Sequence, residues 1–179
     1  AVWALGEPVD VPLPAGTWNL QALRGFPYEI TSEDGVEVAA GQTTEGTLTL
    51  VQAYDTPGWA SADLHVHGPS NDGRTSMEER AASVAVNDLQ LHVATEHDSI
   101  TDYTPVFDAM AITPWSASVP SVEVSTVMRG HFNIYPALGD PDLPNGGAPL
   151  WWEQQVTTSE LFEQFREIVG DEGMIQVNH

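Results

Sequence analysis

Two histidines of this chain stand two residues apart, in the segment Asp63-Leu64-His65-Val66-His67. If this segment is a strand, His65 and His67 point to the same face, because side chains alternate between the two faces of a sheet. Both imidazoles could then reach one metal ion, and Asp63 shares their face. Two buried histidines with hydrogen-bond partners would give the same spacing. Asp-x-His-x-His after a linker is, however, a recurrent metal-binding motif of hydrolases.

Two later segments add a histidine at the end of one predicted strand and a carboxylate within another. Glu96-His97-Asp98 ends a short apolar segment, and in an α/β barrel the carboxyl ends of the strands carry the site. His97 would then lie near the first pair, although a surface acidic turn would have the same sequence. Glu123 stands between two valines, where a carboxylate is costly unless it is paired or binds a metal. A strand residue that faces solvent is the alternative.

The remaining histidines complete a joint pattern. His131 follows Arg129-Gly130, and His179 follows an apolar run; each is weak support when taken alone. Together, five histidines and Glu123 fall at successive strand ends. Zn, Mn and Fe ions take such a mixture of imidazole and carboxylate ligands, and the absence of Cys fits because no soft ligand is needed. His92 begins its strand, at the end opposite the site, and is predicted to be structural.

The elements that must position these residues divide the chain in two. Residues 17–23 and 46–53 alternate in polarity, and Asp34-Gly35 and Ala40-Gly41 are turn signals. Residues 1–58 therefore predict a small β-sandwich-like segment. The Pro-Gly sequence within residues 55–59 breaks the strand pattern and places the boundary.

Residues 59–179 predict alternating strands and helices, which favours an α/β barrel or a doubly wound sheet. Ser76-Met77-Glu78-Glu79 is a capping box, the pattern in which a Ser side chain and a Glu three residues later satisfy free backbone N–H groups, and Thr157-Thr158-Ser159-Glu160 starts another helix. The predicted strands are 63–67, 92–95, 121–124, 133–135 and 174–179, and the predicted helices are 76–91, 101–111 and 157–169.

The charge balance excludes some partners. The chain has 5 basic residues, all Arg, against 26 acidic ones, a net charge of −21. Such a field repels nucleic acid and anionic membranes, and most of the acidic residues are interpreted as a solvated surface. No apolar run approaches the length of a membrane span. The predicted sandwich and the acidity favour a secreted or periplasmic protein.

Six ordered segments resemble the motifs of the PHP (polymerase and histidinol phosphatase) family of metal-dependent hydrolases. In the segment Ala94 to Asp98 the family more often has Asp before the His, where this chain has Glu96. Within the family the similarity is to the CehA/McbA branch, whose members often carry an N-terminal carboxypeptidase-regulatory-like β-sandwich, as expected for residues 1–58. The segments are Trp59 to His67, Asn71-Asp72-Gly73 with the following Ser76-Met77-Glu78-Glu79, Ala94 to Asp98, Val122 to Thr126, Gly130 to Asn133, and Gln176 to His179.

The resemblance implies a distorted (β/α)7 barrel, incomplete in this chain, that holds two or three divalent ions such as Zn, Mn or Fe. Glu123 would bridge two ions. His65 would bind one of them, and His97 and His131 would bind the neighbouring ion. Asp72 is implied by a loosely aligned loop. The implied ligands are His65, His67, Asp72, His97, Glu123, His131 and His179.

The implied activity is hydrolysis of a phosphoester, or of a carbamate or carboxylic ester, by a metal-activated water. Glu123 and His97 would form the catalytic centre, and Arg129 would hold an anionic group of a small-molecule substrate; a solvated arginine is the alternative. The rival hypothesis is a non-catalytic metal-binding module, or a glycan- or protein-binding module, on a degenerate barrel. None of the ligand positions, however, has become apolar.

PHP barrels finish with a late Asp-x-His motif that supplies further ligands. This chain ends at His179, before such a motif. We therefore expect the C-terminal remainder of the same polypeptide to supply them. An intact mass of 19.4 kDa from an unbroken gene that ends here would contradict this expectation.

Overall fold

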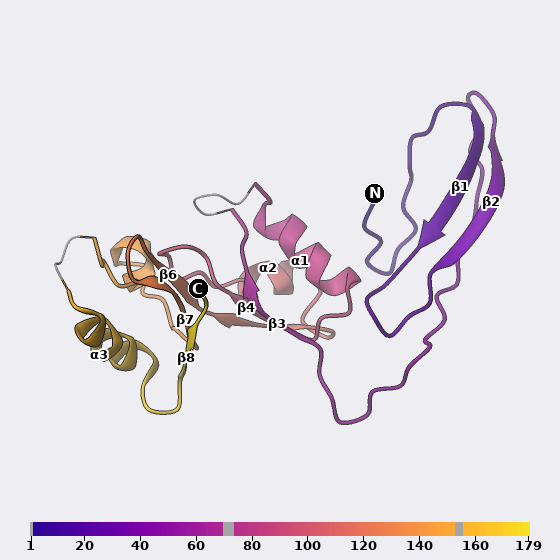
Figure 1. Ribbon diagram of the computed structural model, residues 1–179. Helices are drawn as coiled ribbons and strands as arrows, with labels where there is room; N and C mark the ends of the chain where they lie inside the picture. Colours follow the sequence, from indigo (N-terminus) through magenta and orange to yellow (C-terminus); the bar gives the residue numbers. More distant parts are fainter. Residues whose placement is uncertain (1, 70–73, 153–155) are drawn as a thin grey trace.

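The computed structural model describes residues 2–69, 74–152 and 156–179 (Figure 1). The predicted ligand Asp72 lies outside these residues. The strands are β1 (Gly16–Ala22), β2 (Thr31–Val38), β3 (Ala62–Val66), β4 (Leu91–Ala94), β5 (Ala117–Pro120), β6 (Val122–Thr126), β7 (Gly130–Tyr135) and β8 (Met174–Val177). The helices are α1 (Met77–Val86), α2 (Thr104–Ala109), the 3₁₀ helix η1 (Pro144–Gly147) and α3 (Thr158–Val169).

The β1–β2 hairpin stands apart from the other sheets in Figure 1. Its strands are antiparallel, with a shift of register beside Asn19, whose side-chain oxygen accepts the N–H of Gly35 at 3.1 Å. The predicted turn Asp34-Gly35 is therefore an irregularity inside β2. Residues 46–53 do not form the predicted strand and contribute one bridge, Tyr28 to Gln52. One two-stranded sheet cannot enclose a core between layers, so the expected β-sandwich is wrong.

Strands β3, β4 and β5 form a parallel sheet in that order. Parallel neighbours need crossover connections, and α1 and α2 supply them. α1 begins with the predicted capping box: the Ser76 hydroxyl accepts the Glu79 N–H, and the Glu79 carboxylate accepts the Ser76 N–H, both at 3.1 Å. The helix ends at Val86, earlier than predicted, because Asp88 adopts a positive φ of 57° that a helix does not allow.

Strands β6, β7 and β8 form an antiparallel sheet in that order. α3 lies against this sheet and buries its predicted apolar face. Leu161 and Phe165 are fully buried, and the Phe165 ring lies 5.7 Å from that of Phe132 on β7. The predicted start of α3 at Thr157 is confirmed, and a capping box between Thr157 and Glu160 stabilises it.

The two three-stranded sheets share one continuous segment of chain. Leu91 pairs with Ala117 and Ala94 with Pro120, and the same offset continues beyond β4, where His97 forms a parallel bridge with Glu123. Because only Ser121 separates β5 from β6, the residue that follows β4 and the middle of β6 are forced side by side. This junction positions the candidate site.

The expected (β/α)7 barrel is wrong. Three of the five strand pairings are antiparallel, and the described residues hold only three α-helices. The reason lies in the connections: after β5 the chain enters β6 without a helix and returns at once through β7, so the alternation of strand and helix stops. The histidines of the predicted motifs lie on or beside strands of a mixed parallel and antiparallel arrangement.

His92 lies in the core of the parallel sheet, as predicted for a structural residue. It is fully buried, its ring packs edge-on against Tyr103 at 4.8 Å, and its Nδ1 lies 3.1 Å from the Ser118 hydroxyl. Burial lowers the pKa of His92 to about 4, and the charge of Asp63 only partly offsets this effect. The folded protein therefore holds this imidazole neutral.

A pH-dependent loss of stability follows. Between pH 6.5, the usual pKa of His, and about 4, the unfolded chain binds a proton at His92 that the folded chain does not bind. Stability is therefore fully present above pH 6.5 and falls as the pH drops, by up to about 3 kcal/mol from this residue. Urea unfolding of the wild type and of His92→Gln across this range should show a shallower decline in the variant. Parallel declines would contradict the assignment.

Candidate metal centre

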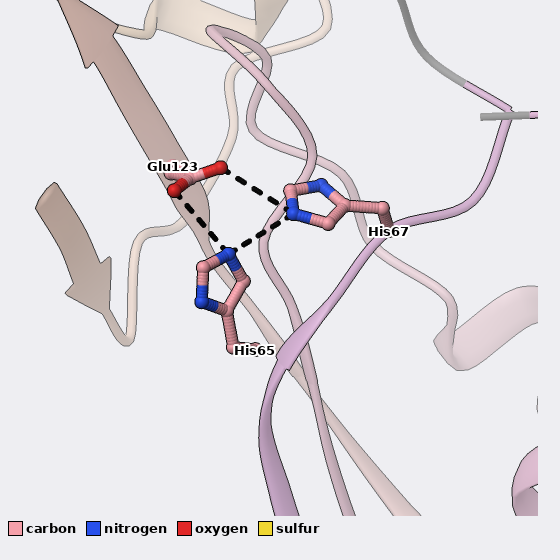
Figure 2. A group of neighbouring side chains, drawn as sticks. All are labelled: His65, His67 and Glu123. Carbon is pink, nitrogen blue, oxygen red and sulfur yellow. Dashed lines mark hydrogen bonds and ion pairs between the residues drawn. The ribbon is translucent and has the colours of Figure 1, made fainter. Parts of the chain in front are cut away.

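His65 and His67 converge on Glu123, as Figure 2 shows. His65 lies on β3 and His67 just after its end, whereas Glu123 lies on β6. The Nε2 atoms of the two histidines are 3.0 Å apart. They lie 3.3 and 3.4 Å from the two carboxylate oxygens of Glu123. These three side chains form the first trio.

The second trio shares the same carboxylate. His97 follows β4 and His131 lies on β7. Their Nδ1 atoms lie 3.0 Å and 3.3 Å from the oxygens of Glu123. The ligand atoms within each trio lie within 4.8 Å of one another. Four histidines from three segments of the chain thus surround one glutamate, and the cluster could bind a metal ion.

Glu123 is the centre of both trios. Oε1 faces His65 and His131, and Oε2 faces His67 and His97. The side chain is only 1 % exposed. Burial raises the pKa of this carboxyl, but the hydrogen bond from Asn178 and the nearby histidines outweigh burial and hold the pKa below its ordinary value. The carboxylate is therefore ionised at neutral pH, as a ligand must be.

The separations between these atoms suit ligands of a common ion. Metal–nitrogen and metal–oxygen distances of about 2.0–2.2 Å at tetrahedral angles place neighbouring ligand atoms about 3.3–3.5 Å apart, and octahedral angles about 3.0 Å. The separations of 3.0, 3.3 and 3.4 Å in the first trio fall in this range. Glu123 Oε2 is buried without a hydrogen-bond donor in the described part of the chain. A cation would satisfy it, so the donor set and its spacing fit a divalent ion.

Two asparagines support Glu123, Asn178 by a direct hydrogen bond and Asn133 through Asn178. Asn178, just after β8, donates from Nδ2 to Glu123 Oε1 at 3.0 Å and to the side-chain oxygen of Asn133 at 2.8 Å. Asn133 is fully buried and donates to the main-chain oxygen of Leu64 at 3.3 Å. These bonds tie β3, β6, β7 and β8 together at the site. Such supporting contacts fix the orientation of a metal ligand.

Hydrogen bonds hold the loop that carries His97 against β6. The N–H of Glu123 donates to the Glu96 carbonyl at 3.0 Å, and the N–H of Asp98 donates to the Glu123 carbonyl at 2.8 Å. One carboxylate oxygen of Asp98 accepts from the N–H of Ser125 and from the indole N–H of Trp151, both at 2.9 Å. Asp98 holds a positive φ of 51°, which this set of bonds stabilises.

A close contact joins the residues that are next to His67 and His97 in the sequence. The Tyr103 hydroxyl donates to Glu96 Oε1 at 2.7 Å, and both side chains are fully buried. Gly68 lies against this pair: a Cβ there would stand 1.8 Å from the Tyr103 oxygen and 2.6 Å from Glu96 Oε1. The residue after His67 and the residue before His97 are therefore held in contact.

The other predicted site residues are placed differently. The His179 ring lies 4.5 Å from that of His131, and its main-chain oxygen accepts the His131 N–H at 2.7 Å, but it belongs to neither trio. Arg129 lies exposed in the turn between β6 and β7. The supporting asparagines Asn133 and Asn178 were not predicted. Their place inside the last two PHP-like segments was the only signal for them.

No protein-family model, curated protein or solved structure matches this chain. The resemblance to the PHP family therefore stays a prediction that rests on the motif residues. As for a membrane span, none of the described helices has the length and apolarity to cross a bilayer.

Proposed function

We propose that this protein is a metal-dependent hydrolase that acts on a phosphoester, or on a carbamate or carboxylic ester, of a small molecule. The observation that carries the proposal is the buried carboxylate of Glu123, which faces two histidine nitrogens with each of its oxygens. A carboxylate placed in this way is suited to bridge two ions. The PHP-like motifs support the same conclusion independently of any barrel.

Each trio would hold one ion. His65 and His67 would bind the first, His97 and His131 the second, and Glu123 both; Asp72 and His179 are the candidates for further ligation. Zn, Mn and Fe are the ions that this mixture of imidazole and carboxylate favours. When bound, such ions supply a nucleophilic water at neutral pH and polarise the substrate oxygen. Arg129, which stands two residues before His131, would hold an anionic group of the substrate.

Metal content and hydrolysis test the proposal together. We expect the purified protein to carry at least one equivalent of Zn, Mn or Fe by elemental mass spectrometry. His65→Ala and His97→Ala should each lose metal, because each removes a ligand from a different trio. Hydrolysis of bis(p-nitrophenyl) phosphate, p-nitrophenyl acetate or 1-naphthyl N-methylcarbamate should disappear with EDTA and return with added metal.

The outcomes separate this function from its rival. His92→Gln is the matched control, because it removes a histidine outside both trios and should leave metal content unchanged. Bound metal without turnover of any of the three ester classes would favour a non-catalytic metal-binding module. Failure to bind metal after reconstitution would contradict both.

A further inference from the structure

A cavity of about 640 Å³ lies away from the metal trios. Its walls come from the loop after β1, from the segment that leads into β3, and from α1. None of the histidines of the trios, nor Glu123, lines it. The cavity is therefore separate from the candidate metal centre, and four of its side chains, Phe26, Trp59, Asp63 and Arg80, suggest what it could bind.

Specific contacts fix the walls of this cavity. Arg24 donates from Nε and Nη2 to Asp88 Oδ1 at 3.1 and 2.8 Å, and its guanidinium lies 5.2 Å from the centre of the Tyr28 ring. Gly25 approaches the end of α1 so closely that a Cβ would lie 2.2 Å from the Asn87 carbonyl oxygen. The loop after β1 is thus anchored to α1, and the cavity between them is a defined feature of the fold.

Two opposite charges line the cavity without neutralising each other. Arg80 Nε is buried and has no hydrogen-bond partner in the described structure. Asp63 accepts the N–H of His65 at 3.1 Å, and among the described residues no ion pair joins it to Arg80. The chain has 26 acidic residues and 5 arginines, yet Arg80 forms no ion pair with any carboxylate of the described residues. Arg80 lines the cavity, and a guanidinium that faces a cavity without a counter-charge favours a ligand with an anionic group.

Two aromatic rings complete the lining. Phe26 is 99 % exposed and Trp59 81 % exposed, and both line the cavity. Covering such rings is favourable by about 25 cal/mol per Å² of apolar area, and a second ring can stack on them with additional gain. The cavity thus offers an aromatic surface beside a separated cation and anion.

We propose that this cavity binds a small aromatic zwitterion, of the chemical class of a free aromatic α-amino acid. The ligand carboxylate would pair with Arg80, whose planar guanidinium suits it. The ligand ammonium group would pair with Asp63, and the ring would pack on Trp59 and Phe26. This assignment accounts for each unneutralised charge and each exposed ring of the cavity, and it does not depend on the hydrolase proposal.

Titration calorimetry with a set of matched compounds tests the proposal. L-Phenylalanine should bind the full chain with a dissociation constant of millimolar or lower. 3-Phenylpropionate lacks the ammonium group, phenethylamine lacks the carboxylate, and L-alanine lacks the ring; each should bind at least tenfold more weakly. Equal binding of phenylalanine and either single-charge analogue would overturn the proposal, and so would no binding of phenylalanine, tyrosine or tryptophan at millimolar concentration.

Charge-removing variants locate the site. Arg80→Gln and Asp63→Asn should each weaken L-phenylalanine about tenfold or more, since each deletes one charge-assisted contact. Arg80→Gln should leave phenethylamine unchanged, and Asp63→Asn, which keeps an oxygen for the His65 N–H, should leave 3-phenylpropionate unchanged. Arg74→Gln removes the same charge from an exposed residue and should have no effect. Losses equal to those of Arg74→Gln would place the binding elsewhere and overturn the proposal.

Discussion

Glu123→Gln should weaken metal binding at both trios by at least about a hundredfold. Glutamine keeps the size of the side chain and an oxygen for the Asn178 amide, but it removes the only carboxylate that the two trios contain. Charge neutralisation by a ligand carboxylate contributes strongly when that carboxylate is buried, as Glu123 is. Competition against a chromophoric chelator measures the affinity, and hydrolysis should fall in parallel.

An exposed glutamate provides the control for this variant. Glu163→Gln on α3 makes the same change of charge on the surface and should leave metal binding unchanged. Circular dichroism of Glu123→Gln should remain that of the wild type. Loss of one ion with full retention of the other would show that the carboxylate does not serve both trios, and full retention of both would contradict the proposed centre.

Gly68→Ala should destabilise the fold by about 3 kcal/mol and also weaken metal binding. The new methyl group would stand 1.8 Å from the Tyr103 hydroxyl oxygen, which is bonded to buried Glu96. Overpacking of a buried site costs about 1–3 kcal/mol or more when the neighbours cannot move. Because Gly68 follows His67 directly, relief of the clash would displace a ligand. Urea unfolding and the chelator competition measure the two effects.

A second glycine and a double variant make this test specific. A Cβ at Gly46 would meet its nearest neighbour, Leu20, at an ordinary 3.6 Å, so Gly46→Ala should change stability by less than about 0.5 kcal/mol. Adding Tyr103→Phe to Gly68→Ala removes the clashing oxygen and should recover part of the lost stability. No recovery, or an effect of Gly68→Ala as small as that of Gly46→Ala, would contradict the packing described here.

The sequence predicted the three α-helices and five of the six strands of residues 59–179, but not β5, because most of these elements have local signals. The capping box at Ser76 marked the start of α1, Thr157 to Glu160 marked the start of α3, and the apolar spacing in α3 identified the buried Leu161 and Phe165. Hydrogen bonds between residues three apart and a helical period act within one element. They are therefore visible in the sequence before any tertiary contact is known.

The arrangement of the strands could not be predicted in this way. The direction in which two strands pair depends on the path of the chain between them, and the step from β5 into β6 through the single residue Ser121 replaced the helix that a barrel requires. In the N-terminal segment, the alternating polarity of residues 46–53 suggested a strand. Alternating polarity does not specify the strand with which a segment pairs, and this segment forms only the bridge between Gln52 and Tyr28.

The sequence indicated which types of residue form the site, because a carboxylate and a pair of histidines within apolar segments point to metal binding. The sequence could not determine that Glu123 stands at the centre of His65, His67, His97 and His131. That arrangement depends on the shared register that places His97 beside Glu123, and on the contacts of Asn178 and Asn133 across three strands. These are long-range contacts, and only the tertiary structure brings their partners together.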